Sequence, residues 1–145
     1  MTDCQDAAEI VGANAIWRDR YGYTVEKASR DILYASSHGD YVLGAFDGAL
    51  AGFAWILPHG GFGRSPYLRL IAVSPKTQSK GVGALLLDAA EQHFARDAKH
   101  MFLMVSDFNQ RAQAFYGRRG YVQVGSVPGF VLADVAEQIW MKRLR

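Results

Sequence analysis

Residue types that could bind a phosphate group gather in one short segment, Gln78-Ser79-Lys80-Gly81-Val82-Gly83-Ala84. Lys80 supplies a cation, and the Gln78 amide can donate a hydrogen bond to an oxygen. Gly81 and Gly83 lack a Cβ, so their backbone can approach a ligand closely or adopt a positive φ. An apolar, strand-like run, Tyr67–Val73, precedes the segment, and an amphipathic helix follows it. A helix that begins after such a turn presents free N–H groups to an anion, which predicts a phosphate site.

An alternative interpretation is that the segment is only a helix start, with glycines that allow tight packing. Two familiar phosphate motifs do not match it. A P-loop would place Gly-Lys-Ser/Thr at the start of the helix, where this chain has Lys80-Gly81-Val82. The dinucleotide fingerprint requires a third glycine, at the position that Leu86 occupies.

The length and composition predict one domain over residues 1–145, with an ordinary globular core. A formal charge of +2 is too small to favour a nucleic-acid partner. The single cysteine, Cys4, excludes an intrachain disulfide framework and fits a reducing compartment. No long apolar run and no signal-like N-terminus is evident, so we expect no membrane partner and a cytoplasmic location.

The periodicity of apolar residues predicts alternating helices and strands. We expect helices over residues 3–21, 24–36, 81–96 and 109–118, with Thr24 as the N-cap of the second. We expect strands over 41–46, 49–57, 67–73, 101–106, 121–127 and 138–144. Asp47-Gly48 predicts a two-residue hairpin, and the glycine-rich stretch Pro58–Pro66 predicts a mobile loop. The central strand–helix–strand unit should place its strands in parallel, whereas the outer strands should pair antiparallel.

The sequence contains two motifs with informative residue types and spacing. The first is Val-x-Pro-x-x-Gln-x-x-Gly-x-Gly, formed by Val73, Pro75, Gln78, Gly81 and Gly83. The second is Asn-x-x-Ala-x-x-Phe-Tyr-x-x-x-Gly-Tyr, formed by Asn109, Ala112, Phe115, Tyr116, Gly120 and Tyr121. With both, the chain resembles the GNAT superfamily of acetyl-CoA-dependent N-acyltransferases. The resemblance implies an α/β, single-domain GNAT-like fold: a mixed central sheet with a parallel splayed pair and helices on both faces.

The resemblance also implies roles for individual residues. Acetyl-CoA would be the cosubstrate, and no metal would be required. The backbone from Gln78 to Ala84 would bind the pyrophosphate, and the main chain near Ile71 and Val73 would bind the pantetheine arm. Tyr116 would be the general acid that protonates the departing sulfur. Asn109 would either contact CoA or act only as a helix N-cap.

The general base is left open by the sequence. Many relatives have a glutamate four residues before the motif's valine, and this chain has Arg69 there. This departure favours an acceptor with a negative group. The remaining candidates are His59, Asp107, Glu137 and ordered water. Each residue also has a structural interpretation: a loop histidine, a turn-forming aspartate and a surface glutamate.

The expected reaction is direct transfer of an acetyl group from acetyl-CoA to a primary amine, without an acyl-enzyme. The partner would be a small-molecule or peptide amine, bound by variable segments whose aromatic content is Trp17, Tyr21, Tyr23, His59, Phe62 and Phe130. The alternative is a non-catalytic acyl-CoA-binding sensor or interaction module. Relatives usually begin with a short strand that is not evident here, so a homodimer that supplies a sheet edge is a further expectation.

Overall fold

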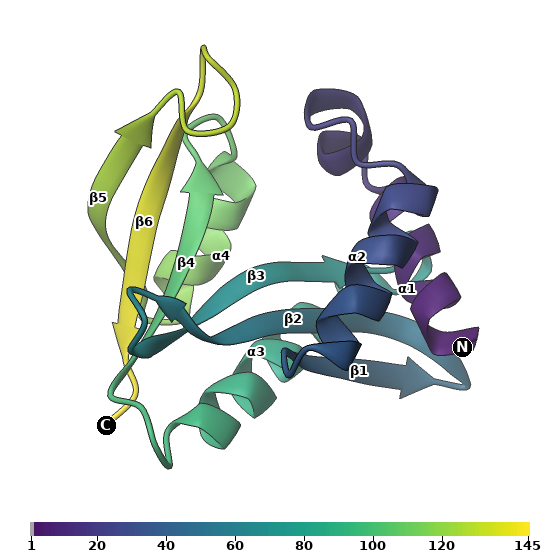
Figure 1. Ribbon diagram of the computed structural model, residues 1–145, viewed down its shortest axis with the longest axis horizontal. Helices are drawn as coiled ribbons and strands as arrows, with labels where there is room; N and C mark the ends of the chain where they lie inside the picture. The colour runs from purple at the N-terminus through teal and green to yellow at the C-terminus, as the bar shows by residue number, and fades with distance from the viewer. Residues whose placement is uncertain (1) are drawn as a thin grey trace. The chain divides into compact units, whose positions relative to one another are not determined.

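The computed structural model describes residues 2–145 as a mixed α/β structure (Figure 1). Its helices are α1 (Thr2–Ala13), α2 (Val25–Ser37), α3 (Val82–Phe94) and α4 (Gln110–Arg118). Its strands are β1 (Tyr41–Asp47), β2 (Ala49–Gly61), β3 (Ser65–Val73), β4 (His100–Ser106), β5 (Val122–Pro128) and β6 (Ala136–Arg143). Over these residues the strands form one six-stranded sheet in the order β1-β2-β3-β4-β6-β5. The expected mixed sheet is confirmed.

Two compact units make up the chain. The first unit comprises Met1–Ile56 and Leu70–Glu91, and the second comprises Leu57–Arg69 and Gln92–Arg145. Both β2 and β3 run from one unit into the other. The single domain expected over residues 1–145 stays a prediction.

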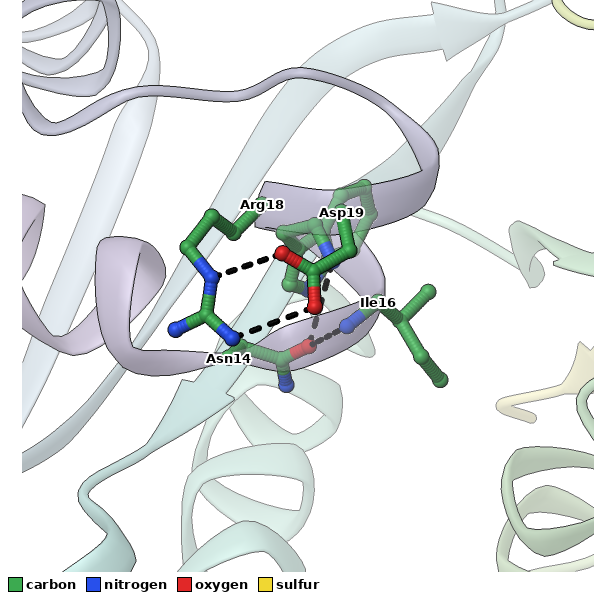
Figure 2. Close-up of polar contacts among 5 residues, drawn as sticks. Asn14, Ile16, Arg18 and Asp19 are labelled. Atoms are coloured by element: carbon green, nitrogen blue, oxygen red, sulfur yellow. Dashed lines mark hydrogen bonds and ion pairs between the residues drawn. The ribbon is translucent and has the colours of Figure 1, made fainter.

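The first helix is shorter than predicted. We expected it to continue to residue 21, but α1 ends at Ala13 and a π-helical turn, Ile16–Arg20, follows. The cause is Asn14, whose side-chain oxygen accepts hydrogen bonds from the N–H groups of Ile16 at 3.0 Å and Trp17 at 3.2 Å (Figure 2). A side chain that caps these N–H groups competes with the helix backbone and starts a new turn. Figure 2 also shows the exposed pair of Arg18 and Asp19, with Nε 2.8 Å from Oδ1.

The next elements follow local signals in the sequence. The Thr24 hydroxyl accepts a hydrogen bond from the Lys27 N–H at 3.2 Å, so the predicted N-cap of α2 is confirmed. β1 and β2 pair antiparallel up to Asp47↔Ala49, with Gly48 at φ 71°, which confirms the hairpin. α1 packs against α2, and α2 packs against β1. Within residues 2–145 no strand precedes α1, and β1 lies at one edge of the sheet.

The mobile loop predicted over Pro58–Pro66 is wrong. β2 continues to Gly61 and β3 begins at Ser65, so only a tight turn separates them. The two glycines are needed for close packing rather than for mobility. A Cβ on Gly61 would lie 2.9 Å from the Ser65 carbonyl oxygen, and one on Gly60 would lie 2.9 Å from the Tyr67 Cβ. Glycine therefore lets the two strands approach each other in this hairpin.

In the second unit, β4 lies between β3 and β6. It pairs in parallel with β3 at Tyr67↔Phe102 and antiparallel with β6 at Ser106↔Glu137. β5 and β6 form an antiparallel pair, drawn as the green and yellow arrows of Figure 1. The alternating burial of β4 places Met101, Leu103 and Val105 in the core.

Candidate active site

A short turn joins β3 to α3 in the first unit and contains most of the predicted phosphate-binding residues. After β3 the chain forms a single 3₁₀ turn, Pro75–Thr77. The Thr77 hydroxyl donates to the carbonyl oxygen of Ala51 at 3.0 Å, and the Ser74 N–H donates to the same oxygen at 2.8 Å. Two hydrogen bonds therefore attach this turn to β2, and they help to fix the position of the residues that follow it, 78–84.

The backbone after this turn adopts the left-handed region twice. Ser79 has φ 68° and Gly81 has φ 80°. A Cβ on Gly81 would meet no atom within 4 Å, so the space beside it is open. Gln78 and Lys80 are exposed in the same segment. The glycine thus serves a backbone conformation, and it leaves room for a ligand to approach.

The first turn of α3 offers unpaired donors beside this open space. The earliest bond of the helix runs from the Leu85 N–H to the Gly81 carbonyl oxygen at 3.0 Å. The N–H groups of residues 82–84 come before that bond and have no acceptor four residues earlier in the helix. Free N–H groups at the positive end of a helix are suited to binding a phosphate.

One residue that positions α3 was missed by the sequence interpretation. A Cβ on Gly52, in β2, would lie 2.8 Å from the Ala72 carbonyl oxygen and 3.1 Å from Val82 Cγ1. It would also lie 3.2 Å from Leu86 Cδ1. Gly52 therefore allows the start of α3 to pack closely on β2. The available signal was a glycine inside an apolar strand, which marks close backbone approach.

Ile71 and Val73 occupy the last part of β3 in the same unit. Their side chains are half-buried, and they alternate with the buried residues Leu70 and Ala72. Since alternate residues of a strand point to opposite faces, Ile71 and Val73 share one face. The resemblance assigns a role to their backbone groups, and that role stays a prediction.

Tyr116 lies near the end of α4 in the second unit. Asn109 caps this helix, because its side-chain oxygen accepts a hydrogen bond from the Ala112 N–H at 3.1 Å. The predicted N-cap is thus confirmed, and the CoA contact stays a prediction. The Tyr116 side chain is only 8% exposed, and its ring contacts Tyr121 at a centroid distance of 5.7 Å. Burial, with a smaller contribution from Tyr67, raises the pKa of Tyr116, so its phenol remains a proton donor well above neutral pH.

A buried carboxylate belongs to the same unit. Glu137, on β6, is 6% exposed, so the surface position considered for it is wrong. The Ser106 hydroxyl donates to it and lies 3.1 Å from Oε1 and 3.2 Å from Oε2. Burial raises the pKa of Tyr67, the positive charge of Arg69 opposes this, and the negative charge of Glu137 adds to it. Ser106 and Tyr67 had not been singled out, because their proximity to Glu137 arises only in the folded sheet.

The other two candidates for the general base have different surroundings. The Asp107 carboxylate accepts a hydrogen bond from the Ala136 N–H at 3.1 Å, and the Asp107 N–H donates to the Ala136 carbonyl oxygen at 3.0 Å. Asp107 therefore joins the end of β4 to the start of β6, which fits its interpretation as a turn-forming residue. His59 is exposed on β2, in the strand that replaces the expected loop.

The aromatic residues expected near the acceptor fall in both units. In the first unit, the ring of Trp17 lies 5.7 Å from Tyr21 and 6.3 Å from Tyr23, centroid to centroid. The Tyr23 hydroxyl donates to Asp31 at 2.9 Å. In the second unit, Phe62 and Phe130 are exposed. The first group is therefore a local aromatic cluster around the π-helical turn.

Two kinds of feature are absent from residues 2–145. No three histidine, cysteine or acidic side chains of this part of the chain gather as metal ligands would. None of its helices is both long enough and apolar enough to span a bilayer.

Several solved structures are similar in fold. An acetyltransferase of the GNAT family from Desulfovibrio desulfuricans superposes with a TM-score of 0.85 at 19% identity, covering 99% of this chain and 94% of that one. An aminoglycoside 6'-N-acetyltransferase complexed with coenzyme A gives a TM-score of 0.79 at 16% identity, covering 98% and 91%. The ribosomal-protein-S18-alanine N-acetyltransferase from Escherichia coli gives 0.68 at 19% identity, covering 80% and 76%. These likenesses show the fold.

No curated protein matches the sequence at a significant level. The family comparison is more informative, because residues 10–121 match the acetyltransferase (GNAT) family. The matched range includes both predicted motifs, with the turn before α3 and the helix of Tyr116. Sequence match and strand order agree, and the chain belongs to the acetyltransferase (GNAT) family.

Proposed function

We propose that the protein transfers an acetyl group from acetyl-CoA to a primary amine by direct attack of the amine on the thioester. The observation that carries the donor half is the start of α3, with unpaired N–H groups at residues 82–84 beside the open space at Gly81. The Gln78–Ala84 backbone and Lys80 would bind the pyrophosphate of the donor. The main chain near Ile71 and Val73 would hold its pantetheine arm, as an added strand would be held.

Tyr116 would be the general acid in this reaction. When the amine nitrogen attacks the thioester carbonyl carbon, the carbon–sulfur bond breaks and the sulfur leaves as a thiolate. The buried phenol is protonated at neutral pH and can give its proton to that sulfur. A thiolate is a good leaving group, so one phenolic donor is sufficient assistance.

The donor site is tested by calorimetric titration with acetyl-CoA, with free CoA and acetyl-pantetheine as comparisons. We expect micromolar binding of acetyl-CoA and CoA, and at least tenfold weaker binding of acetyl-pantetheine, which lacks the pyrophosphate. A panel of amines followed by thiol release then tests transfer. Donor binding without transfer to any amine would favour the non-catalytic acyl-CoA sensor instead.

A pair of glycine variants separates the ligand site from local strain. Gly81→Ala and Gly48→Ala each place a Cβ at a left-handed residue, φ 80° and 71°, with no atom within 4 Å. Both should lose about 1–2 kcal/mol of stability, because the conformation disfavours a side chain. Only Gly81→Ala should also weaken acetyl-CoA binding, by tenfold or more. Equal acetyl-CoA affinity in the two variants would contradict the phosphate site.

A further inference from the structure

We propose that Glu137 receives the ammonium group of the acceptor and removes one of its protons, and that Ser106 positions the carboxylate for this step. The inference rests on the proposed acetyl transfer and names the base that the reaction needs. Primary amines are protonated at neutral pH. The resulting ammonium group cannot attack a carbonyl until a proton has been removed.

The sheet register brings Glu137 and Ser106 together. They are directly paired across β4 and β6, and both side chains are buried, at 6% and 9% exposure. The serine hydroxyl lies within 3.2 Å of both carboxylate oxygens, so it can orient the group. A hydroxyl donor is neutral and leaves the negative charge on the carboxylate. An oriented, charged carboxylate is the group needed to bind an ammonium and accept its proton.

The same register places Tyr67 on the same side of the sheet as Glu137. Tyr67 pairs with Phe102, and Ser106 pairs with Glu137. Phe102 and Ser106 are an even number of residues apart on β4, so their side chains point to one face. The negative charge of Glu137 raises the pKa of Tyr67, and Tyr67 raises the pKa of Tyr116, so the Tyr67 phenol interacts with the candidate base and with the proposed acid.

Two strands and one helix contribute groups that interact with this carboxylate or with Tyr67. β3 contributes Tyr67 and Arg69, β4 contributes Ser106, and α4 contributes Tyr116. Asp107, next to Ser106, is held in the bonds that join β4 to β6. Among the three residues considered as bases, Glu137 is therefore the one that is buried, oriented by a hydroxyl and close enough to affect Tyr67.

Every proton and bond of the proposed reaction can be accounted for. Glu137 takes one proton from the ammonium and later releases it to solvent. The neutral nitrogen then bonds to the thioester carbon, and the carbon–sulfur bond breaks. Tyr116 protonates the sulfur, and the second proton lost by the nitrogen restores the phenol. The products are the acetylated amine, CoA thiol and one proton.

The test compares Glu137→Gln with Glu91→Gln, since Glu91 is another buried glutamate, on α3, at 8% exposure. The assays are acetyl-CoA affinity, thermal unfolding, and transfer to 2-phenylethylamine together with the amine panel between pH 7 and 10. We expect both variants to fold and to bind acetyl-CoA as the wild type does. Glu137→Gln should lower kcat/KM at pH 7 at least about a hundredfold, and Ser106→Ala about tenfold. Glu91→Gln should remain within about twofold of the wild type.

The pH dependence separates a base from a structural residue. The deficit of Glu137→Gln should shrink toward pH 10, because more of the free amine is then already neutral. A deficit that stays constant across this range would overturn the proposal, as would unchanged kcat/KM at pH 7. If the wild type acetylates no amine, the proposed function fails. The ammonium site at Glu137 is then tested separately, by measuring how ligands with and without an ammonium group bind to the protein with CoA bound. Wild type should bind 2-phenylethylammonium at least tenfold more tightly than 2-phenylethanol, and Glu137→Gln should lose that preference. Absence of the preference in the wild type would overturn the ammonium site.

Discussion

The hydroxyl of Thr77 donates a hydrogen bond to the carbonyl oxygen of Ala51, 26 residues earlier in the chain, at 3.0 Å. This bond attaches the turn before α3 to β2, so it helps to place the N–H groups that the proposed donor site requires. The position of the turn therefore depends on a contact between distant parts of the sequence.

Replacing Thr77 with valine should weaken donor binding. The variant keeps the shape of the side chain but loses the hydrogen bond, which should cost about 1 kcal/mol of stability. We expect a three- to tenfold higher dissociation constant for acetyl-CoA in calorimetry. Thr24→Val is the control, since it removes the cap of α2 at a similar cost of about 1 kcal/mol and lies outside the turn. If both variants bind acetyl-CoA equally, the bond to Ala51 does not position the site.

Two glycine-to-alanine substitutions should change stability in opposite directions. Gly52→Ala places a Cβ 2.8 Å from a backbone oxygen and should destabilise the protein by about 1–3 kcal/mol. Gly117→Ala, in α4, meets no atom within 4 Å and should stabilise it by about 0.5–1 kcal/mol through helix propensity. Urea unfolding measures both. If Gly52→Ala were as stable as the wild type, α3 would be able to move away from β2 without loss of stability.

Tyr116→Phe removes the proposed proton donor and retains the ring. We expect acetyl-CoA affinity within twofold of the wild type and turnover reduced tenfold or more. Tyr121→Phe is the matched control, because it removes a second phenol whose ring lies 5.7 Å from that of Tyr116. Steady-state thiol release measures the effect. Unchanged turnover in Tyr116→Phe would exclude the acid role.

Alkaline unfolding should report the buried phenol of Tyr116. Burial raises its pKa in the folded protein, so its contribution to stability is full below about pH 10, the usual pKa of tyrosine. Above that pH the phenol of the unfolded chain ionises first, and the contribution is lost as pH rises toward the folded pKa. Wild type should lose up to about 1.4 kcal/mol per pH unit more than Tyr116→Phe. Parallel urea-unfolding curves for the two proteins between pH 9 and 11.5 would contradict this.

Features that depend on neighbouring residues could be predicted from the sequence. The Asp47-Gly48 hairpin, the Thr24 cap and the Asn109 cap each arise within a few residues, and each is confirmed. The motifs around Gly81 and Tyr116 also identified the family, because their spacing is local.

Features that depend on distant contacts were missed or wrongly predicted. Pro58–Pro66 has a loop-like composition, yet Gly60 and Gly61 are there because two strands approach closely. The end of α1 is an exception, because it was wrongly predicted although its cause is local: the amphipathic pattern continues while the Asn14 side chain satisfies the next N–H groups.

The sequence by itself determined the family, the turn proposed to bind phosphate and the proposed acid, because each is carried by residues close together in the chain. Only the tertiary structure distinguished Glu137 from His59 and Asp107 as a candidate base. Glu137 lies 31 residues after Ser106, and the pairing of β4 with β6 places the hydroxyl beside the carboxylate. Burial and electrostatic environment are properties of assembled strands, so residue type and spacing alone do not contain them.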